Sequence, residues 1–400
     1  MSIEKLIELS RFYGSNSEYT LAGGGNTSFK DEKTLCVKAS GASLSEADED
    51  SFVKMDRASL SAIWDKTYPA GNEEREKEVL ADLMAARENI TGAADTAGQK
   101  RPSVEALLHD IIPFSFVVHL HPALVNGLCC SQNGEKAAEE IFGNSALWIP
   151  SENPGYILSR LVKTELDEYY KKHQKNASVI LLQNHGIFAG ADTADGIKYL
   201  YNGVMSKINA MIKRKPDFSD EVRITQELCE SLLKEISLPE QQNEVMGETE
   251  NFLITCNEIM LTLKELGGCC AFMSSKEIIL LLENRELFYP VSSAFTPDHI
   301  VYSGSDPLFA ETKDSIRDDW EKHVKKTGRN PKITAIKNMG VFGTAANEKA
   351  CGFALDLFKD SVKTAVYAES FGGPLFMAQD KIDFINNWEV ERYRSSVSTK

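Results

Sequence analysis

The spacing of apolar residues divides the first half of the chain into alternating helices and strands. Apolar positions recur every three or four residues in six segments, which predict helices at 3–13, 74–91, 105–111, 135–142, 155–173 and 192–214. Short apolar runs predict buried strands at 34–39, 114–120 and 178–183. This alternation is typical of an α/β protein.

Parts of this pattern recur in the second half of the chain. Three pairs of segments are similar: residues 21–35 and 266–280, residues 183–190 and 337–344, and, less clearly, residues 116–122 and 300–306. In the second pair, Asn-His-Gly in one half aligns with Asn-Met-Gly in the other. A helical pattern follows both, at 192–212 and 345–361. Chance similarity between glycine turns is the alternative. Two matches in the same order and context favour an internal duplication.

Charge and composition narrow the possible partners. The chain has 400 residues, 59 of them acidic and 44 basic, which gives a formal charge of −15. Such a surface repels nucleic acid and anionic lipid, so we expect neither as a partner. It also repels phosphorylated substrates at long range, so local donors must hold any phosphate ester.

We expect a soluble, cytoplasmic protein. No apolar run approaches the roughly 20 residues that a membrane-spanning helix needs. The first 14 residues read as an amphipathic helix rather than a signal peptide. The eight cysteines lack Cys-x-x-Cys spacing, and most lie in apolar stretches, so buried free thiols in a reducing compartment are expected.

Three of the seven histidines occupy distinctive places. His119 and His121 lie two apart on a predicted strand, so their rings project from the same face. His185 ends a second strand, where a turn can present its ring to the same point. Three imidazoles with an open position form a catalytic zinc site. Taken alone, however, a strand His-x-His pair is more often structural or exposed.

Two further signals accompany the histidines. Glu105 stands at the start of a predicted helix, where a solvated carboxylate beside the helix dipole is the ordinary alternative to a catalytic one. The run Gly23-Gly-Gly-Asn-Thr-Ser lets backbone amides approach an anion, and Ser40 adds a donor. A flexible turn is the alternative here. Neither a Rossmann fingerprint nor a P-loop fits the spacing.

Taken together and in this order, these motifs resemble the class II aldolase/adducin family. The matching pieces are Gly24-Gly-Asn-Thr-Ser, Lys38-Ala-Ser-Gly, Pro102-Ser-Val-Glu, His119-Leu-His-Pro and Asn184-His-Gly, and they cover roughly residues 5–215. The whole chain is also similar to the aldolase portion of bifunctional rhamnulose-1-phosphate aldolase/alcohol dehydrogenases. That similarity includes Phe295-Thr-Pro-Asp-His and the ending Trp388-Glu-Val-Glu-Arg-Tyr-Arg.

The resemblance implies a central, mainly antiparallel sheet flanked by helices. The internal duplication adds a second, shortened copy of the same fold. It implies that His119, His121 and His185 bind Zn²⁺ and that Glu105 carries the proton. The substrate phosphate would be held by a set of small and polar residues, namely Gly25, Asn26, Ser40, Gly41 and Ser103. Val104 departs from the family, which often has a second serine there.

The predicted division is a zinc domain at residues 1–238, a linker at 239–243, and a degenerate repeat without metal ligands at 249–400. Our alignment puts Ser303, Ser305 and Met339 where the first half has its histidines, and none is a usual zinc ligand.

The function implied is a zinc-dependent aldolase that cleaves a phosphorylated ketose, of the rhamnulose-1-phosphate or fuculose-1-phosphate type. The products would be dihydroxyacetone phosphate and an aldehyde, formed through an enediolate that the metal stabilises as a Lewis acid. A tyrosine would donate a proton to the aldehyde oxygen, and the candidates are Tyr302, Tyr367 and Tyr393. Family sites lie between subunits, so a homo-oligomer, a dimer or a tetramer, is expected.

Two alternatives remain open. One is another enzyme of the family, such as a pentulose-phosphate 4-epimerase, a sugar-acid phosphate aldolase or a dehydratase. The epimerases have a different residue at the position of Glu105, so glutamate favours the aldolase. The other is a non-catalytic, adducin-like scaffold that has lost its metal ligands. The three retained histidines argue against it for the first half, and for residues 249–400 it is the preferred interpretation.

Overall fold

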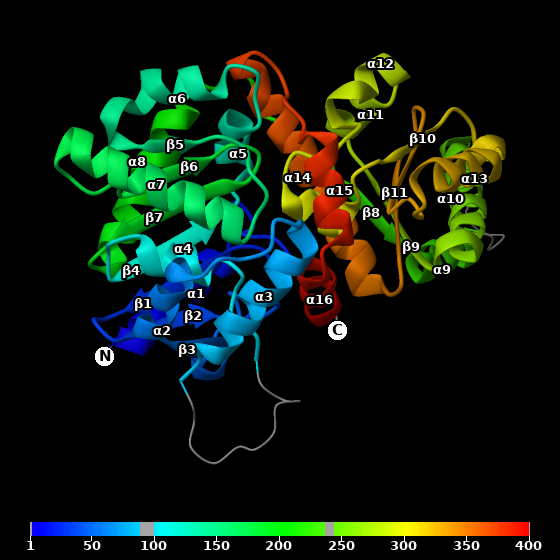
Figure 1. The fold of residues 1–400 in the computed structure, drawn as a ribbon. Coiled ribbons are helices and arrows are strands. Elements are labelled where there is room, and N and C mark those ends of the chain that lie inside the picture. Colours follow the sequence, from blue (N-terminus) through cyan, green and yellow to red (C-terminus); the bar gives the residue numbers. More distant parts are fainter. Residues whose placement is uncertain (1, 89–99, 237–243, 400) are drawn as a thin grey trace.

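In the described part of the chain, the computed structural model contains two β-sheets, each flanked by helices (Figure 1). The structure describes residues 2–88, 100–236 and 244–399. The long helix α14 (Glu348–Ala368) and the helices α15 (Gln379–Asn387) and α16 (Glu389–Ser398) run between the two sheets. The linker predicted at 239–243 lies outside the described residues.

The first sheet has seven strands in the order β3-β2-β1-β4-β7-β6-β5. All neighbours are antiparallel except β5 and β6, which are parallel. The strands are β1 (Asn26–Lys30), β2 (Thr34–Lys38), β3 (Phe52–Asp56), β4 (Phe116–Leu120), β5 (Leu147–Ile149), β6 (Val179–Leu182) and β7 (Gly186–Ala191). The predicted α/β fold with a mainly antiparallel sheet is confirmed.

Eight helices of the described residues accompany this sheet. They are α1 (Ser2–Gly14), α2 (Arg57–Ala62), α3 (Asn72–Ala85), α4 (Ala106–Ile111), α5 (Ala123–Cys129), α6 (Gly134–Phe142), α7 (Tyr156–His173) and α8 (Ala194–Asn209). The six helices predicted from the apolar spacing are all present. Two are shorter than predicted, because α3 ends at Ala85 and α8 ends at Asn209.

The second sheet has five strands in the order β10-β11-β12-β9-β8. They are β8 (Val222–Thr225), β9 (Cys269–Ser274), β10 (Leu308–Ala310), β11 (Ile333–Ile336) and β12 (Gly340–Ala345). The helices beside it are α9 (Gln226–Ile236), α10 (Glu244–Gly267), α11 (Lys276–Leu281), α12 (Arg285–Phe288) and α13 (Ile316–Thr327). Because β8 pairs with β9, the second sheet begins before residue 238, where we had placed the domain boundary.

The second sheet repeats part of the first. Its order β10-β11-β12-β9-β8 corresponds to β5-β6-β7-β4-β1, with the same single parallel pair followed by antiparallel pairs. The hairpin turns also agree, because Asn184 and Asn338 both have left-handed backbones, with φ of 57° and 56°. A long helix, α8 or α14, follows each hairpin. A second, shortened copy of the fold is therefore present.

Strand pairing corrects two of the three predicted alignments. β9, which we had matched to residues 21–35, takes the place of β4, and residues 299–303 form a π-helical turn rather than a strand. Short glycine-rich similarity does not reveal which strands become neighbours, because pairing is a long-range property. Only the match between 183–190 and 337–344 agrees with the topology.

The register also corrects the residues that stand in for the histidines. His119 pairs with Phe188 on β7, and its counterpart Phe272 pairs with Phe342 on β12. Counting from there, the positions of His119, His121 and His185 are filled in the second copy by Phe272, Ser274 and Met339. Ser303 and Ser305 are not the counterparts. Phe272, Ser274 and Met339 are not usual zinc ligands either.

Among the described residues, no helix combines the length and apolar character needed to cross a bilayer. All eight cysteines are free thiols, and six of them are buried, as predicted.

Candidate metal centre and active site

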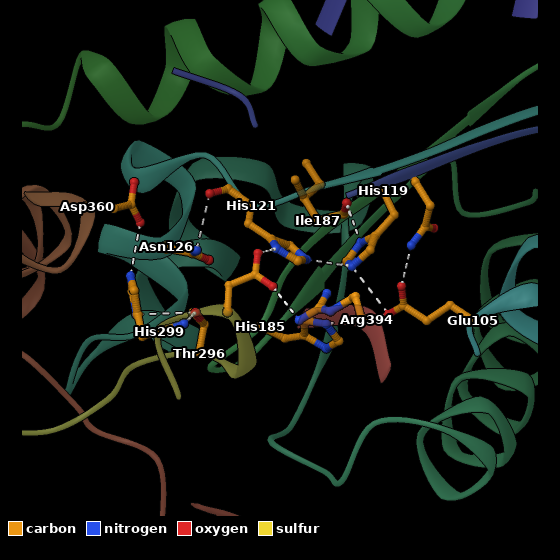
Figure 2. A network of polar contacts seen from close by, with 12 residues as sticks. Glu105, His119, His121, Asn126, His185, Ile187, Thr296, His299, Asp360 and Arg394 are labelled. Atoms are coloured by element: carbon orange, nitrogen blue, oxygen red, sulfur yellow. Dashed lines mark hydrogen bonds and ion pairs between the residues drawn. The ribbon is translucent and has the colours of Figure 1, made fainter. Parts of the chain in front are cut away.

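Three imidazoles meet at the end of β4, as the sequence predicted. His119 is the last residue but one of β4, His121 follows the strand, and His185 lies in the turn between β6 and β7. One ring nitrogen from each lies within 4.8 Å of the others. Figure 2 shows the three rings pointing toward one another beside Glu105. The group can hold one metal ion.

The turn that presents His185 is shaped by its neighbours in the sequence. Asn184 adopts φ of 57°, a conformation that asparagine tolerates better than most residues. Its amide donates to the carbonyl oxygens of Phe295 and Leu375, at 3.2 and 2.8 Å. A side chain on Gly186 would overlap His121, since an added Cβ would lie 2.6 Å from that ring.

The Nε2 atoms of His119 and His121 face each other, but in neutral rings neither can donate a hydrogen bond to the other. Nδ1 of His119 donates to the carbonyl of Ile187 at 3.0 Å, and Nδ1 of His121 donates to Asp298 at 2.5 Å. A neutral imidazole then keeps only a lone pair on Nε2, yet these two Nε2 atoms lie 2.8 Å apart. Burial lowers the pKa of His119 well below its ordinary value and that of His185 to about 3. The rings of His119 and His185 are therefore neutral, as metal ligands must be.

Glu105 adds a fourth acceptor to the cluster. Its Oε1 lies 3.3 Å from Nε2 of His119 and 3.4 Å from Nε2 of His185, and it has no hydrogen-bond partner although it is buried. A single proton can bridge only one pair of these acceptors, whereas one divalent cation satisfies all of them. The residues therefore fit a metal ion, and imidazole ligands suit Zn²⁺.

The same geometry decides between the two interpretations of Glu105. The residue precedes α4, but its side chain makes no capping bond and is only 6% exposed. It is not a solvated first-turn carboxylate.

A buried chain of hydrogen bonds holds Glu105 from behind. Asn26 donates its amide to Oε2 of Glu105 at 2.7 Å, and the Asn26 carbonyl oxygen accepts from Nε2 of His109. Nδ1 of His109 then accepts from the hydroxyl of Ser28 at 2.7 Å. His109 is fully buried, and burial lowers its pKa well below the ordinary value, so it is neutral. His109 belongs to no distinctive motif in the sequence, so its link to Glu105 was not predicted.

All five residues predicted to bind phosphate line one small pocket with Glu105. The lining residues are Gly23, Gly25, Asn26, Lys38, Ser40, Gly41, Ser103, Val104, Glu105, His121, Pro154, His185, Pro297, Val390, Glu391 and Arg394. The glycine run thus lies beside the histidines, from which it is far apart in the sequence. Of the predicted site residues, only His119 does not line the pocket, because it is completely buried behind it.

Two basic side chains in this pocket were not predicted. Lys38 donates to the carbonyl of Ala42 at 2.8 Å, and burial lowers its pKa to about 7. Arg394 comes from α16 and forms ion pairs with Asp298 and Glu391 at 2.8 and 2.7 Å. Both belonged to motifs already noted, Lys38-Ala-Ser-Gly and the ending Trp388–Arg394, but nothing local in the sequence shows that the latter reaches the site.

The second half therefore forms part of the site. Asp298, from the motif Phe295-Thr-Pro-Asp-His, contacts His121 directly. Burial acts to lower the pKa of His121, but the Asp298 carboxylate outweighs it and raises that pKa. Burial acts to raise the pKa of Asp298, and His121 and Arg394 together hold it far below its usual value. The group is a buried, compensated charge network.

Of the three candidate tyrosines, Tyr302 contacts a residue that lines the pocket, Gly23. Its hydroxyl is bonded to Ser398 at 3.0 Å and lies against Gly23. Tyr393 stacks under Arg101 at 4.0 Å, and Tyr367 packs against Gly127 of α5.

Comparisons with known proteins show a family and several similar proteins. The family described as Class II Aldolase and Adducin N-terminal domain matches residues 4–202. The uncharacterized oxidoreductase YuxG of Bacillus subtilis (strain 168) is 20% identical over 435 aligned positions, which cover 99% of this chain and 58% of the relative. The chain thus spans well under two thirds of that relative's length.

Solved structures are also similar. The N-terminal class II aldolase domain of a conserved protein from Thermoplasma acidophilum is 24% identical, with a TM-score of 0.43, over 52% of this chain and 93% of its own. An L-fuculose 1-phosphate aldolase is 17% identical, with a TM-score of 0.35, over 62% of this chain and 94% of its own.

Proposed function

The N-terminal half of this chain belongs to the class II aldolase and adducin family, and from that premise we propose that the chain is a zinc-dependent aldolase. Its substrate is a ketose 1-phosphate of the rhamnulose or fuculose type. The products are dihydroxyacetone phosphate and an aldehyde.

The observation that carries this proposal is the position of one oxygen atom. Oε1 of Glu105 is buried, lacks a hydrogen bond and faces the Nε2 atoms of two imidazoles. An unpaired buried carboxylate oxygen is costly unless a cation or a substrate proton completes it. Its other oxygen is fixed by Asn26, so the free oxygen is aimed at the metal position. This arrangement suits a general base that acts beside a Lewis acid.

Electrostatics within the pocket support an anionic substrate. The chain as a whole carries −15, so attraction has to come from local groups. Arg394 supplies positive charge, and the buried amine of Lys38, with a pKa of about 7, adds a donor. Gly25 and Gly41 have left-handed backbones, at φ of 68° and 81°, that expose amides. Ser40 and Ser103 add hydroxyl donors. The Asn26 side chain is already bonded at both ends, so we assign it to holding Glu105 rather than to binding phosphate.

Zinc, held by His119, His121 and His185, would supply Lewis-acid stabilisation of negative charge on the substrate oxygens. Glu105 moves the proton at the carbon next to the ketone: it delivers the proton in cleavage and removes it in synthesis. The near-complete burial of Glu105 and His119 excludes water from that proton. Tyr302 is the tyrosine best placed to serve the aldehyde oxygen, because its hydroxyl lies beside Gly23 of the pocket.

We further propose that the two halves of the chain imitate two neighbouring subunits. The second copy has Phe272, Ser274 and Met339 in place of the ligands, and contributes Asp298 and Arg394 instead. Two chains would then provide the equivalent of four family domains, so we expect a homodimer. Light scattering tests this, and a tetramer of equivalent chains around one fourfold axis would contradict it.

The activity is tested with zinc-loaded protein and a panel of ketose 1-phosphates, followed by coupled detection of dihydroxyacetone phosphate. We expect release from at least one 6-deoxyketose 1-phosphate, and none from the same sugar without phosphate. If metal-loaded protein splits no phosphorylated ketose but acts on a pentulose phosphate at C4, the epimerase alternative replaces the aldolase.

A further inference from the structure

We infer that Asp298, a residue of the second half, is the orienting partner of the metal ligand His121, and that metal affinity at the first-half site depends on it. This inference rests on the proposed metal site. It extends that proposal because it gives the second half, which lacks ligands of its own, a defined chemical task.

The contact between the two residues is short and buried. Oδ2 of Asp298 lies 2.5 Å from Nδ1 of His121, and the side chains are 6% and 10% exposed. A carboxylate can only accept here, so the proton stays on Nδ1 and Nε2 of His121 is left as the metal-facing nitrogen. Carboxylate–histidine–metal triads of this kind fix the ring and raise its basicity.

Two of the three histidines, His119 and His121, obtain the hydrogen-bond partners of their Nδ1 atoms from different parts of the chain. His119 is oriented by the carbonyl of Ile187, which belongs to the same sheet. His121 has no such partner in its own sheet among the hydrogen bonds of the described residues, and its Nδ1 is bonded only to Asp298. The second half therefore provides the hydrogen-bond acceptor that Nδ1 of His121 does not find in the first half.

Arg394 holds Asp298 in place from the other side. Its guanidinium reaches Oδ1 of Asp298 at 2.8 Å and pairs with Glu391 at 2.7 Å. Figure 2 shows the Arg394 side chain close to the three imidazoles. Because each oxygen of Asp298 has one fixed partner, the carboxylate cannot rotate away from His121 without losing a buried ion pair.

The glycine run makes room for this approach. A methyl group on Gly24 would overlap Oδ2 of Asp298, and one on Gly23 would lie 2.7 Å from the hydroxyl of Tyr302. One on Gly41 would lie 2.7 Å from Cβ of Val397 in α16. Three glycines from the motifs that predicted a phosphate loop are thus places where the second half approaches the loop too closely for a side chain. Gly24 in particular admits Asp298.

The test measures metal affinity directly in the full-length chain. Apo protein is titrated with Co²⁺ while its visible absorption is recorded, and Zn²⁺ affinity is obtained by competition with a chromophoric chelator. We expect Asp298→Ala to bind about 10–100-fold more weakly than the wild type, with altered Co²⁺ bands. Asp298→Asn should recover part of the loss, because its amide oxygen still accepts from Nδ1.

A matched control separates this role from a general loss of buried charge. Glu277 is a second-half carboxylate, 6% exposed, that pairs with Arg214 at 2.7 Å, and it does not line the pocket. Glu277→Ala should leave affinity within about twofold of the wild type. If Asp298→Ala does not fold, Gly24→Ala takes its place, since the added methyl displaces Asp298 without removing its charge.

The outcomes distinguish the two proposals. A wild type that binds no Co²⁺ or Zn²⁺ overturns the metal site itself. Stoichiometric binding by the wild type, with equal affinity and equal Co²⁺ bands in folded Asp298→Ala and Gly24→Ala, overturns the role of Asp298 and leaves the metal site standing. Equal losses in Asp298→Ala and Glu277→Ala also overturn it.

Discussion

Replacing Glu105 by glutamine tests the proposed chemistry with the smallest change in shape. Glutamine has the size of glutamate, and its carbonyl oxygen can accept from Asn26 as Oε2 of Glu105 does at 2.7 Å. The amide nitrogen then takes the place of Oε1, between 3.3 and 3.4 Å from two Nε2 atoms. It cannot accept a proton. The three imidazoles are untouched.

The expected result is an enzyme that keeps its metal but turns over slowly. Losing a positioned proton-transfer group costs about 10²–10⁴ in rate, or about 3 to 5 kcal/mol of barrier. Turnover is measured as dihydroxyacetone phosphate released per second, and metal content by elemental analysis of the same sample. Glu277→Gln is the control, because it also neutralises a buried carboxylate but lies outside the pocket.

Two results would refute this reasoning. Turnover within about threefold of the wild type would remove Glu105 from proton transfer. Loss of the metal in step with the loss of activity would make Glu105 a ligand rather than a base.

Three other predictions concern stability. Chelation should lower the unfolding temperature, because metal at 100 times its dissociation constant stabilises by about 2.7 kcal/mol, and in His185→Ala calorimetry should show no response to added Zn²⁺. The pKa of Lys38 is about 7 in the folded chain and 10.5 ordinarily. Between these two pH values the amine is protonated in the unfolded chain but not in the folded one, so the free energy of unfolding rises with pH by up to about 1.4 kcal/mol per pH unit. Lys38→Met should remove that part of the slope in urea unfolding between pH 7.5 and 9.5, and an unchanged slope would show that the amine stays charged. Asn184→Ala forces alanine into φ of 57° and removes two hydrogen bonds, so urea unfolding should show a loss of about 2–4 kcal/mol, and Asn184→Gly should lose less.

The sequence by itself determined the features that depend on neighbouring residues, such as single helices, turns and the two faces of one strand. His119 and His121 share a face because strand side chains alternate, and the match of Asn184-His-Gly with Asn338-Met-Gly identified two equivalent hairpins. The spacing of apolar residues located six helices, with errors confined to their ends. These features depend on residues a few positions apart.

Tertiary structure alone decided which distant segments meet. Strand pairing set β9 in the place of β4, against our alignment, because neighbours in a sheet are chosen by packing over the whole fold. The same packing brought Asp298 against His121 and Arg394 into the pocket, although they lie 177 and 273 positions beyond His121 in the sequence (298 − 121 and 394 − 121). Each reads in the sequence as an ordinary charged residue. Only burial beside the histidine cluster, where an uncompensated charge is costly, gives it a role.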